Sequence, residues 1–161
     1  MSDPLATYLH DHLAGSNFAI DLLKSMRDHY PNESLGQLAS TVLLEVEEDR
    51  ETLRRIVDRV GKGSPDLKEA AAWILEKTSR LKLSHGKAQG IGTFQALETL
   101  ALGILGKVAL WRALATLAEK DDRLRDLDFR ELIARAEAQH AKIEGSRLLV
   151  ACTALAPQSV P

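Results

Sequence analysis

The sequence has few of the residues that build sheets or cross-link a chain. Aromatic residues make up only 4% of its 161 residues, while Ala and Leu are abundant and β-branched residues are scarce beside them. This balance favours helix over sheet. Its single cysteine, Cys152, can form no internal disulfide and no CxxC pair. A reducing, cytoplasmic location is therefore the expected one.

An excess of one charge is also missing. The chain has 21 Lys and Arg against 23 Asp and Glu, a net charge of −2, so we expect no nucleic-acid partner. Arg54, Arg55 and Arg59 lie close together, but Glu51 and Asp58 lie among them. Such mixed charge predicts a solvated helix face.

Long uninterrupted apolar runs are absent too. The N-terminal residues 1–4 lack the basic region and apolar run of a signal peptide. The most apolar stretch, residues 94–118, contains Glu98, Lys107 and Arg112. Charges at the centre of a membrane span are costly, so we expect a soluble chain without a membrane partner.

The chain does contain clear signals for helix ends. Cap residues followed by proline, capping boxes and a glycine stop divide it, at Asp3-Pro4, Ser34/Gln37, Gly61, Ser64-Pro65 and Asp128/Glu131. These signals predict one all-α domain over residues 1–161. Its four long helices span about 4–29, 34–61, 93–120 and 128–155, and a short helix spans about 65–81. Long helices of matched length favour a side-by-side bundle.

This layout resembles the ferritin-like superfamily. The resemblance implies a ferritin-like four-helix bundle: two antiparallel helix hairpins joined by a long crossover that contains a short helix. Metal-binding members of the superfamily carry a two-metal carboxylate site, with one Glu each from the first and third helices and a Glu-x-x-His pair from the second and fourth. Glu137-Ala-Gln-His140 matches the fourth helix and Glu98 can match the third. Glu45-Val-Glu-Glu48 has glutamate in place of the histidine, and the first helix has no glutamate.

Helical-wheel positions identify polar residues that face the core. With about 100° per residue, His12, Asp49 and His140 lie near the centres of the apolar faces of the first, second and last helices. A rise of about 1.5 Å per residue in a ferritin-like topology places these three at similar heights near mid-bundle. The same estimate places Glu98 well above that layer.

Two interpretations of this cluster remain open. One is a metal site in which two imidazoles and a carboxylate, completed by Glu45, Glu137 or Glu144, bind iron, manganese or zinc. The other is a buried His–Asp hydrogen-bond network that fixes helix register, because a buried carboxylate needs partners. Lys107 could then supply the counter-charge and remove the need for metal.

Small residues inside two helices form the remaining feature. Gly103 and Gly106 lie in the most apolar helix and Gly15-Ser16 in the first. A glycine inside a helix costs about 1 kcal/mol relative to alanine, so it predicts either close helix contact or room for a ligand or neighbouring subunit. Trp111 and Cys152 are expected to be core packing residues.

Three functions follow from these alternatives. No nucleophile–base set, phosphate loop, zinc finger or dinucleotide fingerprint is present, and whether the chain is an enzyme stays open. The first hypothesis is a ferritin-like bundle without a working di-iron site that acts as an interaction or stress-associated protein. The alternative is a metal-binding protein or oxidoreductase with its site in the core. A third is a module that binds a small apolar ligand near Gly103 and Gly106. Long bundles often pair along a hairpin face, so a homodimer is also compatible with the pattern.

Overall fold

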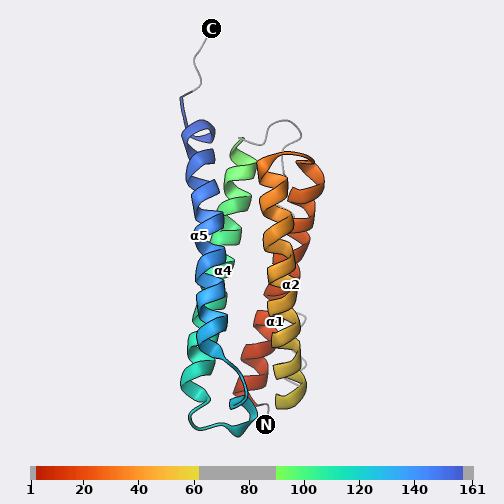
Figure 1. Cartoon of the computed structure of the whole chain (residues 1–161), viewed down its shortest axis with the longest axis vertical. Helices are drawn as coiled ribbons and strands as arrows, with labels where there is room; N and C mark the ends of the chain where they lie inside the picture. The colour runs from red at the N-terminus through yellow and green to blue at the C-terminus, as the bar shows by residue number, and fades with distance from the viewer. Residues whose placement is uncertain (1–2, 62–89, 158–161) are drawn as a thin grey trace.

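The computed structural model describes residues 3–61 and 90–157, which form four long helices, one short 3-10 helix and no strand (Figure 1). Their bounds are α1 (Pro4–His29), α2 (Ser34–Val60), α4 (Ile91–Leu117), η1 (Asp122–Leu124) and α5 (Phe129–Ala154). The prediction of an all-α four-helix bundle is confirmed for this part of the chain. The short helix predicted at about 65–81 lies outside the described residues.

Most helix ends occur where the capping signals predicted them. The Asp3 side chain accepts a hydrogen bond from the Leu5 N–H at 2.9 Å, and the Asp128 side chain accepts one from the Glu131 N–H at 3.0 Å. Each bond satisfies a backbone N–H that has no partner within its own helix. Gly61 ends α2 with a φ of 103°, a conformation that glycine adopts without steric cost.

One predicted cap residue and the predicted bounds of one helix differ from the structure. Glu33, not Ser34, is the N-cap of α2, and its side chain makes no capping hydrogen bond. The predicted loop up to residue 92 is shorter, because α4 begins at Ile91 and Gly92 is buried within its first turn. The same helix ends at Leu117, three residues before its predicted end at about 120.

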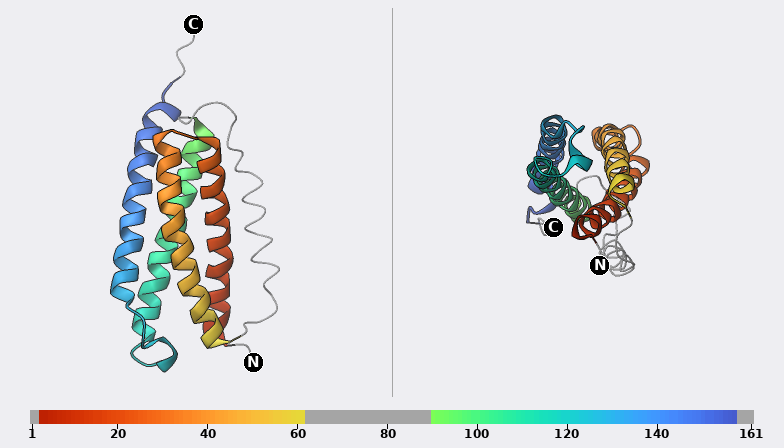
Figure 2. Two further views of the ribbon diagram at one scale, coloured as in Figure 1. Left: turned by 45° about the vertical axis from the view of Figure 1, so that its right-hand side comes forward. Right: turned by 90° about the horizontal axis from the view of Figure 1, so that it is seen from below.

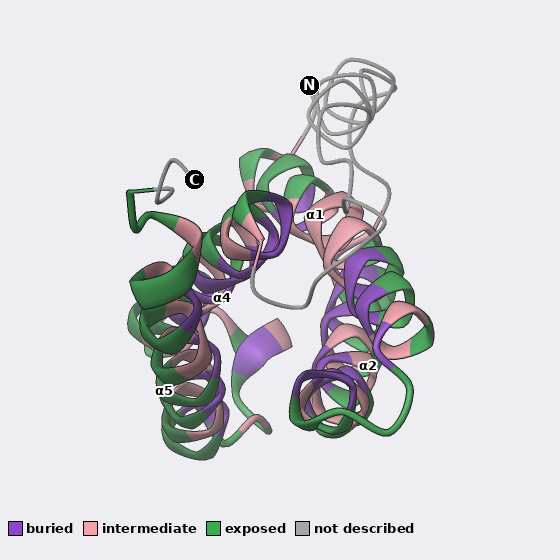
Figure 3. Ribbon diagram, turned by 90° about the horizontal axis from the view of Figure 1, so that it is seen from above, coloured by how far each residue is buried: buried purple, intermediate pink, exposed green. Residues whose placement is uncertain are grey.

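The helices pack around a common core as two pairs. α1 packs along α2 and α4 along α5, α1 also contacts α4, and α2 also contacts α5. Viewed along the bundle, η1 lies between α2 and α5 near one end of the molecule (Figures 2 and 3). Leu124 of η1 is fully buried. Leu124 therefore covers one end of the core, in the space between α2 and α5.

Buried side chains line the inner faces of all four helices (Figure 3). One cluster fills the half of the bundle next to the α1–α2 turn, and the other surrounds Trp111 in the opposite half. The turn is fixed to α4 by the buried hydrogen bond between the Tyr30 and Thr93 hydroxyls at 2.6 Å. At Gly36 a Cβ atom would overlap the Tyr30 carbonyl oxygen, so the turn requires glycine there. Cys152 is exposed on α5, so its prediction as a core residue is wrong.

α4 is by length and composition apolar enough to span a membrane, and 39% of its most apolar window is buried within the chain. Core helices of bundles share this composition, so it is weak evidence for a membrane span. All three charged side chains of α4 bind partners on other helices: Glu98 binds α5, Lys107 binds α2, and Arg112 binds α5. In a membrane span these three charged side chains would be exposed to lipid, which is costly, whereas in the bundle each one has a partner of opposite charge.

Candidate functional site

A buried ion-pair network joins three helices at mid-bundle. Asp49 of α2 is 2% exposed, and its Oδ2 accepts hydrogen bonds from Lys107 Nζ at 2.6 Å and from Gln139 Nε2 at 3.1 Å. Arg135 donates to Oδ1 of the same carboxylate. Lys107 also donates to the amide oxygen of Gln139. Asp49 therefore has the partners that a buried carboxylate requires.

Lys107 depends on this network for its charge. Burial lowers the pKa of the Lys107 ammonium below its ordinary value, while the charge and hydrogen bond of Asp49 oppose that shift. Removing a charged group from water disfavours its charged form. The counter-charge predicted for Lys107 is therefore present, and the ion pair links α2 directly to α4.

The predicted glutamate ligands lie elsewhere, each bound to a cation near the bundle surface. The pairs are Glu45 with Lys142 at 2.6 Å, Glu137 with Arg112 at 2.6 Å, and Glu98 with Arg147 at 3.1 Å. Glu144 also binds Arg147. These carboxylates are neutralised by cations, and Glu98 lies apart from the Asp49 network, as its estimated height predicted.

The two predicted histidines do not join Asp49. His12 is half-buried and packs edge-on against Tyr8 with ring centroids 4.7 Å apart. Burial lowers its pKa, and the nearby charge of Asp11 opposes that shift. His140 is half-buried on α5. Among the hydrogen bonds of the described residues, none connects either imidazole to the Asp49 carboxylate.

The candidate ligands are therefore not brought together into a metal site, one of the two interpretations that the sequence left open. Within residues 3–61 and 90–157, no group of three or more His, Cys, Asp or Glu side chains is placed to hold a metal ion. The physical reason is the rotation of α5, which presents Gln139 rather than His140 to the core. Asp49 is the one candidate at the centre of a polar cluster, and its partners are cations and an amide.

Sequence reasoning missed Arg135 and Gln139, although a signal for Gln139 was present. The buried residues of α5 near this layer are spaced by four, three and four, at Leu132, Ala136, Gln139 and Ile143. This spacing is the narrow stripe of a helix in a bundle. If Gln139 lies on that buried stripe, His140 follows it by one residue and therefore lies about 100° around the helix, at the side of the stripe.

A cavity of about 680 Å³ lies beside this network, between α1, α2 and α4. Its lining from α1 is Asp11, His12, Gly15, Ser16, Phe18 and Ala19, and its lining from α2 is Val46, Asp49, Arg50 and Leu53. From α4 it is lined by Thr99, Leu100, Leu102, Gly103, Ile104, Gly106, Lys107, Leu110 and Trp111. Among these residues Asp11, Leu102 and Gly103 are exposed, so they mark the opening to solvent.

The interior glycines create room in this cavity. A Cβ atom at Gly15, Gly103 or Gly106 would meet no neighbouring atom within 4 Å, and all three residues line the cavity. Of the two alternatives that the sequence left open for Gly103 and Gly106, close helix contact is therefore wrong. The glycines border open space of a size that suits a small molecule, because ligand pockets commonly measure about 300–1,000 Å³.

The cavity has a polar end, which Leu53, Leu110 and Trp111 share with the charged side chains, and a more apolar end. α1 runs antiparallel to α2 and to α4 (Figure 1), so His12, Arg50 and Lys107 lie toward one end. Phe18 and Val46 lie toward the other. Two buried polar atoms among the lining residues have no hydrogen-bond partner: Nε of Arg50 and Nε1 of Trp111. Buried polar groups are normally paired, so these atoms are unusual features of the site.

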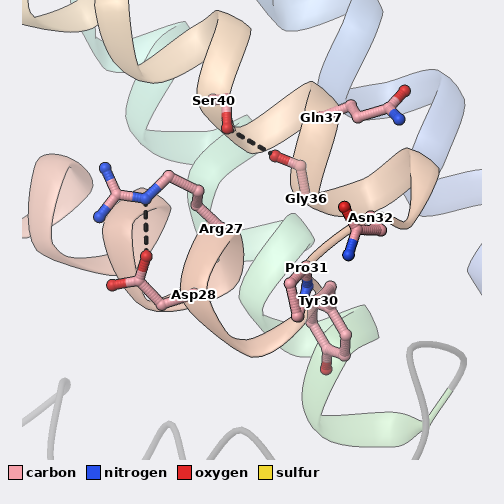
Figure 4. Close-up of a pocket in the computed structure, with 8 residues that line it drawn as sticks. All are labelled: Arg27, Asp28, Tyr30, Pro31, Asn32, Gly36, Gln37 and Ser40. Carbon is pink, nitrogen blue, oxygen red and sulfur yellow. Dashed lines mark hydrogen bonds and ion pairs between the residues drawn. The ribbon is translucent and has the colours of Figure 1, made fainter.

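A second hollow lies at the α1–α2 turn, with a volume of about 460 Å³ (Figure 4). Several of its polar groups already bind one another: Arg27 donates to Asp28 at 2.7 Å, and the Ser40 hydroxyl donates to the Gly36 carbonyl at 2.9 Å. The cavity between α1, α2 and α4 is therefore the better candidate site.

Comparison with known proteins adds no further identification. The chain matches no family model, no curated protein and no solved structure. The functional argument therefore depends on the geometry of the chain itself.

Proposed function

We propose that this protein is a helical-bundle binding protein that holds a small, mainly apolar molecule in the cavity between α1, α2 and α4. The observation that carries the proposal is the 680 Å³ cavity itself, lined mainly by apolar side chains and bordered by Gly15, Gly103 and Gly106. Sites for small molecules are typically concave and apolar with a few polar groups. This cavity has that composition.

The metal-binding or oxidoreductase alternative has weaker support. Its carboxylates are bound to lysine and arginine side chains, and a metal ion would have to displace those cations. Elemental analysis of protein purified without a metal-affinity tag separates the two proposals. One or two equivalents of iron, manganese or zinc, lost in a His140→Ala variant, would favour the metal alternative.

We also propose that the bundle has the ferritin-like topology. The pairing of α1 with α2 and of α4 with α5 supports two helix hairpins. An interaction or stress-associated role, a cytoplasmic location and a homodimer stay predictions. A binding protein of the kind proposed here is compatible with all three.

The test of the binding function uses a neutral apolar probe whose fluorescence rises in an apolar site, N-phenyl-1-naphthylamine. Gly106→Leu places a side chain in the open space beside Gly106, so we expect probe affinity to fall at least about tenfold. Gly145→Leu is the matched control, because Gly145 lies inside α5, also has free space around it, and does not line the cavity. It should change affinity by less than about twofold.

Two results would contradict the binding function. One is a wild-type protein that does not bind the probe. The other is an equal loss of affinity in the two leucine variants, which would place the probe outside the cavity. Circular dichroism of each variant confirms that its helices are intact.

A further inference from the structure

We propose that the ligand of the cavity is an amphipathic monocarboxylate, whose carboxylate binds Arg50 and whose apolar body lies between Phe18, Val46 and Leu100. This inference rests on the proposed function and adds the chemical class of the ligand. It depends on the charges at the polar end of the cavity and on the length of the apolar part.

Arg50 is the cation in the cavity lining that lacks a counter-charge. No ion pair or hydrogen bond involves its side chain among the described residues, and its Nε is buried without a partner. Lys107, the other cation of the lining, is already bound to Asp49. A guanidinium presents a planar fork of donors that matches a carboxylate in a bidentate arrangement. A carboxylate at this position would satisfy Nε and neutralise the charge.

Two neighbouring groups can add hydrogen bonds to the same end. Lys107 uses two of its three N–H donors for Asp49 and Gln139, which leaves one donor. Burial lowers the pKa of His12, so its imidazole is neutral near pH 7 and retains one N–H donor. These groups favour an oxygen acceptor without adding a second uncompensated charge.

The charge balance favours a single negative charge on the ligand. Lys107 and Arg135 are balanced within their own network by two carboxylates, because Asp49 binds both cations and Glu48 also binds Arg135. Asp11 also lines the cavity but is exposed at its mouth, where water screens its charge. One cation of the lining, Arg50, therefore remains for one anionic group, and a doubly charged phosphate would leave one charge without a partner.

The apolar body of the ligand follows from the remaining lining. The cavity is lined along α4 from Thr99 to Trp111, a length of about 18 Å at 1.5 Å per residue. The part beyond Lys107, toward Thr99, presents Leu100, Leu102 and Ile104. A chain or ring system of moderate length would bury its apolar surface there, which is favourable by about 25 cal/mol per Å².

Isothermal titration calorimetry near pH 7 with decanoate and decanol tests the inference, because the two probes share an alkyl chain and differ in charge. Decanoate should bind wild-type protein at least about tenfold more tightly than decanol. Arg50→Gln should remove that preference, because decanoate affinity should fall at least about tenfold and decanol affinity much less. Arg50→Lys should restore part of it. Arg54→Gln is the matched control, because Arg54 lies one turn along α2, is exposed and does not line the cavity.

The outcomes separate the two proposals. Equal affinity for both probes in wild-type protein would overturn the carboxylate inference but retain the binding function. An equal loss of affinity for both probes in Arg50→Gln would also overturn it, because the arginine would then act on folding or on the apolar body. Failure of decanoate, decanol and the neutral naphthylamine to bind would overturn both proposals.

Discussion

Replacing Asp49 with alanine should destabilise the fold more than any surface charge change. Asp49 is 2% exposed, and the substitution would leave Lys107 buried without its counter-charge and Gln139 without an acceptor. Removing one partner of a buried ion pair costs about 3–5 kcal/mol. Because each kcal/mol shifts the Tm of a chain of this size by about 2–4 °C, the expected loss is roughly 6–20 °C.

Glu45 provides the matched control on the same helix. It lies one turn before Asp49 and also binds a lysine, but Glu45 and Lys142 are 26% and 41% exposed, against 2% and 15% for Asp49 and Lys107. Partly exposed pairs contribute about 0–1 kcal/mol. Glu45→Ala should therefore lower the free energy of unfolding by less than about 1 kcal/mol.

Urea unfolding followed by far-ultraviolet circular dichroism measures both variants. A double variant, Asp49→Leu with Lys107→Met, removes both charges and should recover much of the lost stability, because two apolar residues can replace a buried pair. Equal losses for Asp49→Ala and Glu45→Ala would refute the reasoning. Such a result would mean that water reaches the Asp49 network as freely as it reaches Glu45.

The remaining predictions concern glycine and titration. Gly103→Ala should stabilise the protein by about 0.5–1 kcal/mol in urea unfolding, because its Cβ enters open space, whereas Gly36→Ala should destabilise it by overlap with Tyr30. The Lys107 pKa is lowered from 10.5 in the folded state. At pH values between that lowered pKa and 10.5, the unfolded state binds more protons than the folded state, so the free energy of unfolding rises with pH. Lys107→Met should flatten this rise. The Asp3 pKa is lowered from 3.8, first by its hydrogen bond from Arg123, so its contribution is present above pH 3.8 and lost as pH falls through the folded value. Asp3→Asn should reduce that acid-induced loss.

Each of these results has a clear contrary outcome. An identical pH dependence in wild type and Lys107→Met would show that the ammonium is not desolvated. An unchanged acid transition in Asp3→Asn would show that the interaction with Arg123 does not persist in solution. Similar stability in the two alanine variants would contradict the contrast in space around the two glycines.

Helix positions were predictable because their signals are local. Asp3 and Asp128 bind backbone N–H groups two or three residues away, and Gly61 ends α2 by its own conformation. Ser34 had the same signature but does not act as a cap, because the chain enters α2 one residue earlier, at Glu33. The preceding turn is held by tertiary contacts of Tyr30, and a local pattern does not contain such contacts.

The site was predictable only in part, because it depends on helix rotation. Asp49 and its counter-charge Lys107 followed from the wheel positions and the estimated depth. A small error in the face assigned to α5 placed His140 instead of Gln139 in the core, so both interpretations of the cluster included an imidazole where the structure has an amide. The cavity depends on how far α1, α2 and α4 stand apart. Glycine spacing alone allows both close contact and open space, so sequence could not decide between them.

The exposed position of Cys152 makes the homodimer question directly measurable. Since this is the only cysteine in the chain and it is exposed on α5, a nitroxide label can be attached there without removing any other thiol. One label per chain means that any dipolar coupling between spins must come from two molecules. Such coupling would report on the pairing of copies and on the distance between their α5 helices.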